Sequence, residues 1–251
     1  MAPGGAKRGK RASDPFRFDQ HLLNEGVAAS DGPPDLRLAG ADEAGRGSLA
    51  GPLVAAAVVL DYSAAPFRGL ERLTDSKLMT AEAREAAYPL ILRYAARVSC
   101  VAVSPGSIDR VGLHRSNLSA LCVALASLEG HYSLAVVDAF DLKRPDLRAR
   151  PIVGADYKSA AVAAASVVAK VVRDRLMRSL ASEYPVYGFE EHVGYATDRH
   201  REALRLHGPC DIHRLSFRGV ACPQLELWES GDAVAAVLSL EEPFPPEVIE
   251  D

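Results

Sequence analysis

The sequence predicts an α/β fold built around a mixed β-sheet, in the arrangement of a sheet flanked by helices. Three apolar segments come early in the chain, at residues 36–43, 53–60 and 97–104. Two shorter ones, at 134–138 and 151–154, then alternate with helical patterns. A run of strands followed by strands that alternate with helices is typical of sheets that contain both antiparallel and parallel pairs.

We expect helices where apolar residues recur with a helical period, at residues 16–27, 80–93, 117–128, 159–184 and 197–207. Thr80 is a suitable N-cap for the second of these helices. Its buried stripe is predicted to consist of Ala83, Ala86, Ala87 and Leu90. The segment 160–165 contains only small apolar residues, so the fourth helix can pack very close to the sheet.

One folded domain, at residues 35–222, is expected between two tails. Residues 1–34 are predicted to be a disordered tail and linker that includes the short helix, because the first 16 are small and basic and Ser30 begins a Ser-Asp-Gly-Pro-Pro run. Residues 223–251 carry eight acidic side chains and no basic one, and form an acidic tail with a short helix at 225–240. The formal net charge of -4 therefore hides a core, residues 41–222, that carries +3. A polyanionic partner would bind this core.

The composition indicates an ordinary globular protein. Of 251 residues, 48% are hydrophobic and 25% are charged, and no apolar run reaches the roughly 20 residues that a membrane span needs. The N-terminus lacks the apolar segment of a signal peptide. The four cysteines, Cys100, Cys122, Cys210 and Cys222, form no close pair, which argues against a zinc site or a disulfide framework. We therefore expect a cytoplasmic monomer with free thiols and no membrane partner.

Two adjacent carboxylates, Asp42 and Glu43, end the first predicted strand and precede the turn Gly45-Arg46-Gly47. Neighbouring side chains on a strand point to opposite faces, so these two can share a site only at a strand end or a bulge. The glycines leave the turn without side chains that would block a ligand. The pattern indicates a metal site beside a phosphate or sugar contact, although a solvated turn before a hairpin would have the same sequence.

Two further acids follow later strands. Asp138 ends the strand at 134–138, and Asp156 follows the strand at 151–154. Ligands gather at the carboxyl ends of strands in such sheets, where four acids would repel one another unless cations lay between them. Oxygen-only ligands suit Mg²⁺ or Mn²⁺, and two such ions about 3.5–4 Å apart catalyse phosphoryl displacement. Alternatively, Asp138 and Asp156 would merely cap helices.

Seven motifs together resemble the ribonuclease HII family, the type 2 ribonucleases H. They run in family order over residues 38–220. The motifs are Gly40–Gly47, Asp75–Lys77, Val137-Asp138, Ala155-Asp156, Ala164–Asp174, Tyr187–Phe189 with His192–Tyr195, and His213–Phe217. The resemblance implies a ribonuclease H-like mixed sheet with a helical C-terminal extension. It also implies hydrolysis of the RNA strand in RNA–DNA hybrids, leaving a 5′-phosphate and a 3′-hydroxyl, and incision of duplex DNA 5′ of a single ribonucleotide.

The resemblance assigns metal binding and catalysis to Asp42, Glu43, Asp138 and Asp156, with two Mn²⁺ or Mg²⁺ ions when substrate is bound. One ion would activate water and the other would stabilise the leaving 3′ oxygen. We expect Asp42 to lie between the two ions. The substrates implied are RNA–DNA hybrid and ribonucleotide-containing duplex DNA.

Substrate contacts follow from the same resemblance. The backbone of Gly45, Arg46 and Gly47 would contact a 2′-hydroxyl, and Tyr195 matches a tyrosine that stacks on the neighbouring deoxyribose. Four side chains could hold phosphates, namely Ser76, Lys77, Arg214 and Ser216. Lys170 could do so too, or could form an ion pair with Asp174 one helical turn later. His200 and His213 are interpreted as surface or scaffold residues rather than catalytic ones.

Three positions depart from the commoner family pattern, and each lacks a lysine that is frequent there. They are Leu78, Gly154 and Val193. We expect weaker and less salt-dependent hybrid binding than in a lysine-complete relative.

Two other functions compete with the ribonuclease hypothesis: a catalytically weak hybrid-binding module, and another ribonuclease H-like nuclease such as a resolvase. The four intact acids argue against the first, and Gly45-Arg46-Gly47 with Tyr195 argues against the second.

Overall fold

A five-stranded mixed sheet organises the molecule, and its strand order is β3-β2-β1-β4-β5. The computed structural model describes residues 14–27 and 35–221. Strands β1 (Arg37–Ala44), β2 (Leu53–Asp61) and β3 (Ala95–Val103) pair antiparallel. Strands β4 (Leu134–Asp138) and β5 (Ala149–Ile152) continue the sheet in parallel from β1. The predicted mixed sheet is thus confirmed.

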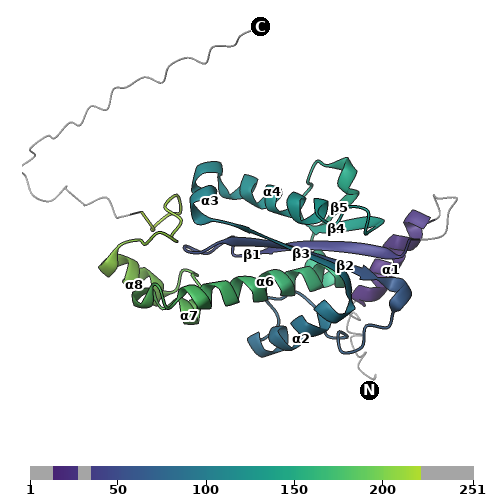
Figure 1. Ribbon diagram of the computed structural model, residues 1–251, viewed down its shortest axis with the longest axis horizontal. Helices are drawn as coiled ribbons and strands as arrows, with labels where there is room; N and C mark the ends of the chain where they lie inside the picture. The colour runs from purple at the N-terminus through teal and green to yellow at the C-terminus, as the bar shows by residue number, and fades with distance from the viewer. Residues whose placement is uncertain (1–13, 28–34, 222–251) are drawn as a thin grey trace, which may run out of the picture.

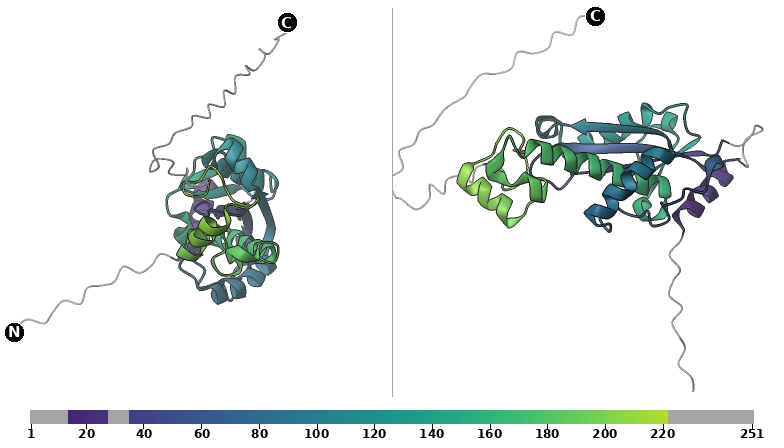
Figure 2. Two further views of the ribbon diagram at one scale, coloured as in Figure 1. Left: turned by 90° about the vertical axis from the view of Figure 1, so that its left-hand side faces the viewer. Right: turned by 60° about the horizontal axis from the view of Figure 1, so that its bottom comes forward.

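Helices form a layer on each face of this sheet (Figures 1 and 2). One layer contains α1 (Pro15–Val27), α2 (Ala81–Tyr94) and α6 (Ala160–Leu180), and the other contains α4 (Leu113–Ala126). The shorter helices are α3 (Pro105–Val111), α5 (Ala155–Lys158), α7 (Phe189–His192) and α8 (Asp198–His207). Short 3₁₀ segments lie at Tyr62–Ala64, Pro145–Leu147 and Pro185–Tyr187. Helices α7 and α8 lie beyond one end of the sheet (Figure 1).

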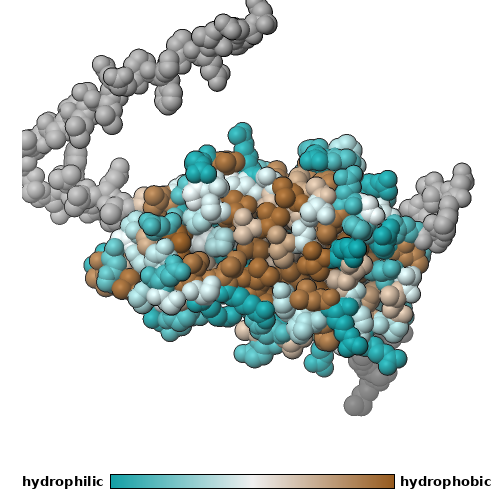
Figure 3. All heavy atoms as spheres, in the orientation of Figure 1, coloured by the Kyte–Doolittle hydropathy of each residue, from teal (hydrophilic) through white to brown (hydrophobic). Residues whose placement is uncertain are grey.

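Alternation along β2 divides the core into two clusters. Val54, Val58 and Leu60 face α6, whereas Ala55 and Val59 face α4. Because neighbouring strand residues point to opposite faces, one fully apolar strand supplies both clusters. The same alternation in β1 places Asp42 and Glu43 on opposite faces of the sheet. On one side of the molecule, apolar side chains form a band between more hydrophilic borders (Figure 3).

Strand β1 and helix α6 approach each other closely at Gly40. A Cβ at Gly40 would lie 2.1 Å from the carbonyl carbon of Ala161, so only glycine fits there. Small residues on the facing turn of α6 make this approach possible, as the alanine run at 160–165 predicted. Ser159 begins the helix as its N-cap and accepts a hydrogen bond from the amide of Val162.

Helix α1 is part of the folded unit, which corrects the predicted domain boundary at residue 34. Leu22 and Leu23 are buried against the core. The carboxylate of Asp19 is fully buried, accepting hydrogen bonds from the amide of Ala161 at 2.9 Å and from the hydroxyl of Tyr62. Burial raises the pKa of Asp19 to about 6.

Several predicted boundaries moved. The strand at 134–138 and the Thr80 N-cap are confirmed, since the Thr80 side chain accepts from the amide of Ala83. The predicted buried stripe of α2 is confirmed only at Ala87, which is buried, and at Leu90, which packs partly buried against the core. It was wrong at Ala83 and Ala86, which are exposed, and it missed the buried Ile91. Strand β5 begins and ends two residues earlier than predicted, and α4 begins four residues earlier. The helix predicted at 225–240 lies outside the described residues. In the part of the chain that the structure describes, no helix is both long and apolar enough to cross a membrane.

Candidate active site

The four predicted acids lie around the ends of β1 and β4, and we call them the acid cluster. Asp42 and Glu43 are near the end of β1, Asp138 is the last residue of β4, and Asp156 lies in α5. Strands β1 and β4 are adjacent and parallel, so their carboxyl ends meet at one edge of the sheet. Asp138 also accepts a hydrogen bond from the amide of Ala155, at 2.9 Å, which ties β4 to the start of α5.

Asp42 and Glu43 reach this edge from opposite faces of the sheet. Asp42 is two residues after Gly40, so it lies on the same face of β1, against α6, where the hydroxyl of Ser166 is its neighbour. Glu43 lies on the opposite face of β1, the face that packs against α4, and is beside the buried side chain of Asn117. The alternation of the strand therefore spreads the two acids across its end, as the sequence predicted.

Burial and mutual repulsion raise the pKa values of Asp42, Glu43 and Asp156. Burial is the larger cause for Asp42, and the charge of Glu43 adds to it, so the pKa of Asp42 rises to about 8. Burial also raises the pKa of Glu43. The pKa of Asp156 is raised by burial and then by the charge of Asp138. The acid cluster is thus an electrostatically unfavourable arrangement that a cation would stabilise.

Lys77 supplies positive charge to this cluster. Its Nζ lies 3.8 Å from Asp156 Oδ2 and 4.0 Å from Asp75 Oδ1. Burial lowers the pKa of Lys77, but the carboxylates of Asp75, Asp42 and Asp156 outweigh this effect and raise it above its ordinary value. Sequence reasoning did not single out Asp75, although it begins the motif that contains Lys77. A fifth acid therefore borders the site.

The donor set suits hard divalent cations, because it consists of carboxylate oxygens. Asp42 Oδ2 is buried and has no hydrogen-bond partner among the described residues, which is costly unless a ligand or cation satisfies it. Within residues 14–27 and 35–221, no three His, Cys, Asp or Glu side chains already stand in a metal-holding arrangement. Binding an ion would therefore require the carboxylates to draw closer together.

The Gly45-Arg46-Gly47 turn follows the acids directly. Arg46 Nη1 lies 3.5 Å from Glu43 Oε1, and its guanidinium carbon lies 4.9 Å from the centre of the Phe140 ring. The two glycines differ in their surroundings. Gly45 has φ +91°, and a Cβ there would meet Nε of Arg173 at 2.0 Å, whereas a Cβ at Gly47 would have no neighbouring atom within 4 Å. Packing requires Gly45, but it does not require Gly47.

Two buried arginines hold this turn and the loop after it; we call Arg173 and Arg214 the arginine clamp. Arg173 donates to the carbonyls of Ala50, Pro52 and Val193 at 2.9–3.0 Å. Arg214 donates to the carbonyls of Gly51 and Arg46 at 2.9–3.1 Å.

Both guanidinium groups are fully enclosed, with 0% exposure of each residue. A phosphate contact by Arg214 is therefore wrong: its donors point into the protein and position the backbone.

Other predicted contact residues lie close to the turn. Tyr195 is half-buried, and its ring centre lies 4.9 Å from Lys170 Nζ and 5.3 Å from the guanidinium carbon of Arg173. Lys170 Nζ also forms an ion pair with Asp174 Oδ1 at 2.8 Å, so the predicted ion pair is present. Sequence reasoning missed the contact between Lys170 and Tyr195, which joins positions 25 residues apart.

The two predicted serines have different surroundings. Ser76 is buried and accepts a hydrogen bond from the Ser166 hydroxyl at 2.7 Å, which anchors the Lys77 loop to α6. Ser216 is exposed and donates to Asp109 Oδ1 at 2.5 Å. Ser216 can therefore face a ligand, and Ser76 positions its neighbour.

The three lysine-lacking positions have distinct environments. Gly154 adopts φ +69°, and a Cβ there would lie 2.2 Å from the Tyr157 ring, so a side chain at this position would require Tyr157 to move. Val193 is buried with φ +45°, an uncommon conformation for a β-branched residue. Leu78 is 75% exposed beside Lys77. A lysine could replace Leu78 without any repacking.

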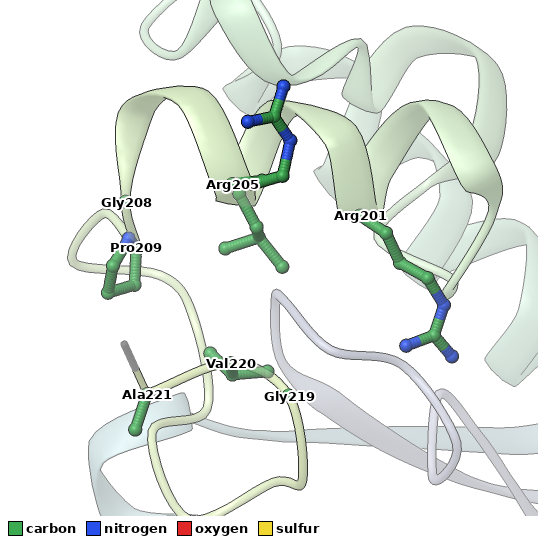
Figure 4. Close-up of a pocket in the computed structure, with 8 residues that line it drawn as sticks. Arg201, Arg205, Gly208, Pro209, Gly219, Val220 and Ala221 are labelled. Carbon is green, nitrogen blue, oxygen red and sulfur yellow. The ribbon is translucent and has the colours of Figure 1, made fainter. Parts of the chain in front are cut away.

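A separate hollow of about 320 Å³ lies beside α8. Its walls include Leu204, Pro209, Val220 and Ala221, while Arg205 points away from Val220 and Ala221 (Figure 4). No carboxylate or imidazole lines it. The hollow therefore offers no group for acid–base or metal chemistry, and the acid cluster remains the candidate active site.

Comparison with known proteins finds relatives in sequence. A sequence model of the family described as ribonuclease HII matches residues 39–220. Ribonuclease HII of Rhizobium meliloti (strain 1021) is 48% identical over 183 residues, which cover 72% of this chain and 82% of that protein. Ribonuclease HII of Azorhizobium caulinodans is 44% identical over 215 residues, 86% of this chain and 78% of the relative.

Solved structures share the fold. Ribonuclease H2 from Pyrococcus horikoshii OT3 has a TM-score of 0.63 at 29% identity, covering 73% of this chain and 95% of that one. The RNase HII of Archaeoglobus fulgidus, solved in complex with PCNA, has a TM-score of 0.58 at 30% identity, covering 68% and 88%. Bst-RNase HIII, solved with Mn²⁺, is 21% identical with a TM-score of 0.56, covering 87% and 71%, and shows the fold alone.

Proposed function

Since this chain belongs to the ribonuclease HII family and is a ribonuclease H, we propose that it cleaves RNA–DNA hybrids and also incises duplex DNA 5′ of a single embedded ribonucleotide. The products would carry a 5′-phosphate and a 3′-hydroxyl. One observation carries the proposal: the open, exposed Gly47 lies four residues after Glu43, in the turn that follows two acids of the cluster. A sugar can approach the backbone there, close to groups that can support phosphodiester hydrolysis.

We propose that Asp42, Glu43, Asp138 and Asp156 hold two divalent cations, Mn²⁺ or Mg²⁺, when substrate is bound. Such ions supply an activated water and stabilise the leaving 3′ oxygen, with no need for a nucleophilic side chain. Two features of the protein support this assignment, namely the unpartnered Oδ2 of Asp42 and the raised pKa values of Asp42, Glu43 and Asp156.

The protein's own side chains would bind and orient the nucleic acid. The Lys77 side chain is 71% exposed, so its ammonium group can pair with a substrate phosphate when cations neutralise the acids. The Gly45-Arg46-Gly47 backbone would test for a 2′-hydroxyl, and Tyr195 would pack on the next, deoxy, sugar. A site that hydrogen-bonds a hydroxyl can reject the analogue lacking it by about 10⁴-fold, because its own polar groups are then left unpaired.

The test compares three duplexes of one sequence: a continuous hybrid, a DNA duplex with one ribonucleotide, and an all-DNA duplex. Wild type should cut the first two, the second on the 5′ side of the ribonucleotide, and leave the third intact. Tyr195→Ala should impair cleavage at the single ribonucleotide more than cleavage of the hybrid, whereas Tyr195→Phe keeps the ring and should retain the preference. Failure of wild type to incise the single-ribonucleotide duplex would overturn the proposal, and equal losses in Tyr195→Ala would remove Tyr195 as the junction reader.

A further inference from the structure

Three buried histidines lie beside the loop that carries Tyr195, and the proposed reaction uses none of them. The rings of His192 and His200 stack with centroids 4.6 Å apart, and those of His200 and His213 lie 5.2 Å apart. All three residues are at most 9% exposed. Buried polar rings of this kind are costly unless each ring nitrogen has a partner.

Hydrogen bonds fix the proton on each ring of the pair His200 and His213, which we call the histidine chain. The amide of Cys210 donates to His213 Nδ1 at 2.9 Å, so this nitrogen accepts and the proton of the neutral ring lies on Nε2. His213 Nε2 lies 3.0 Å from His200 Nε2 and therefore donates to it. The remaining proton of His200 lies on Nδ1, which donates to the carbonyl oxygen of Tyr195 at 2.8 Å.

The ring of His192 also supports this loop, through hydrogen bonds that fix its tautomer. The amide of Gly194 donates to His192 Nδ1 at 3.2 Å, so His192 Nε2 carries the proton and donates to the carbonyl of Tyr187 at 2.7 Å. The carbonyl of Gly194 in turn accepts from the amide of Leu49, at 2.9 Å, in the loop that follows Gly47. The peptide before the Tyr195 ring is thus tied to the glycine turn, and the peptide after it to the histidine chain.

From this geometry we infer that His200 and His213 are positioning residues for Tyr195, forming a one-directional hydrogen-bond chain from the Cys210 amide to the Tyr195 carbonyl. The inference rests on the proposed role of Tyr195 as reader of the deoxyribose. The chain fixes where the backbone presents the ring, and so sets its distance from the sugar that the glycine turn selects. A shift of about 1 Å in such a group can cost up to roughly 100-fold in rate.

Two amide substitutions of His200 separate positioning from bulk stability. His200→Asn places an amide nitrogen close to the position of Nδ1 and can still donate to the Tyr195 carbonyl. His200→Gln places its amide at the position of Nε2, keeps the contact with His213 and loses the donor to Tyr195. Both variants remove the imidazole, so each is the stability control for the other.

The measurement is kcat/KM on the single-ribonucleotide duplex and on the continuous hybrid, with the melting temperature of each variant. His200→Gln should lose about 10-fold or more on the single-ribonucleotide duplex relative to the hybrid, and His200→Asn should retain most of the wild-type ratio. Equal losses on both substrates in both variants, in proportion to lowered stability, would overturn the inference.

A readout without substrate distinguishes failure of this inference from failure of the proposed function. Two-bond ¹⁵N–¹H correlation spectra of the imidazole rings should show His213 protonated on Nε2 and His200 on Nδ1, and His200→Gln should shift the Tyr195 ring resonances more than His200→Asn. The opposite tautomers, or equal Tyr195 shifts, would refute the chain even if Tyr195→Ala proves the junction role. The expected spectra together with an unselective Tyr195→Ala would instead refute the junction role.

Discussion

The acid cluster and the arginine clamp contain buried charges with opposite degrees of hydrogen bonding, although the clamp holds the backbone of Arg46, in the turn that follows Asp42 and Glu43. In the clamp, Arg173 and Arg214 give their donors to five backbone carbonyls, and no part of either residue is exposed. In the acid cluster, one carboxylate oxygen of Asp42 has no hydrogen-bond partner among the described residues, and burial, followed by the charge of Glu43, raises the pKa of Asp42. The satisfied region is scaffold, and the unsatisfied region is where a ligand would lower the free energy.

Neutralising an acid should therefore separate activity from stability most sharply. Asp42→Asn or Asp138→Asn should lower cleavage by about 10³-fold or more, because the remaining carboxylates would hold cations poorly. The Asp42 carboxyl has a folded pKa of about 8 against an ordinary 3.8, so wild-type unfolding free energy should fall as pH rises from about 4 to about 8. Asp42→Asn should remove that fall and melt at or above the wild-type temperature in metal-free buffer at pH 8.

An exposed acid provides the control. Asp141→Asn changes the same charge at a side chain that is 52% exposed and pairs only with Lys143 in the described structure, so it should leave cleavage and melting unchanged. Full cleavage by Asp42→Asn would show that the unsatisfied acid is not needed, and the contrast between the two regions would fail.

Removing a clamp residue should instead lower mainly the stability of the fold. Arg214→Met leaves the carbonyls of Gly51 and Arg46 without their buried donor, and should lower the free energy of unfolding by about 3–5 kcal/mol. Urea denaturation measures this value. Arg218→Met, at an exposed arginine four residues later, should cost less than about 0.5 kcal/mol. Similar values for both substitutions would mean that the clamp does not hold the turn.

Gly45 and Gly47 allow the same comparison, between a residue that packing requires and one that a substrate would contact, within one turn. Gly45→Ala should lower the free energy of unfolding by about 1–3 kcal/mol, because of its φ of +91° and its contact with Arg173. Gly47→Ala should change stability by less than about 0.5 kcal/mol, since its Cβ meets no atom. The methyl group introduced by Gly47→Ala should instead slow cleavage about 10-fold, because it would obstruct the substrate sugar. Normal cleavage by a folded Gly47→Ala variant would show that the open surface is not a substrate contact.

The histidine chain should give the smallest effect, a pH dependence confined to acid solution. Burial lowers the pKa of His213 to about 4 and also lowers that of His200, which is next to His192 and Arg201. A depressed folded pKa means that the stabilisation is present above pH 6.5 and is lost as pH falls towards 4. We expect a loss of about 1 kcal/mol after allowance for solvent screening. Denaturation at pH 7 and pH 5 should show a smaller difference in His213→Asn than in wild type, and an equal difference would contradict this assignment.

Local patterns predicted the sheet and the location of the acids well, because both depend on short-range order. The apolar run in β2 and the strand ending at Asp138 needed no knowledge of the rest of the chain. The acids lie at strand ends, and parallel strands bring such ends together.

Long-range packing could not be predicted in the same way. Nothing next to Arg214 in the sequence indicates that Gly51, 163 residues away, takes its donors. Composition likewise separates an exposed from a buried alanine poorly, which explains the error at Ala83 and Ala86. The contacts around Tyr195 could be found only in the folded structure, since they involve Lys170 and Leu49 from distant segments.

The docking of α1 has a consequence for the order in which the protein can be made. Asp19 accepts from the amide of Ala161, a partner 142 residues further along the chain. During synthesis at about 5–20 residues per second, α1 would leave the ribosome many seconds before α6 exists to receive it. Its apolar Leu22 and Leu23 would have no partner on α6 through that interval. Helix α1 is therefore translated well before it can be packed, and a nascent chain that stalls before residue 161 leaves it without this partner.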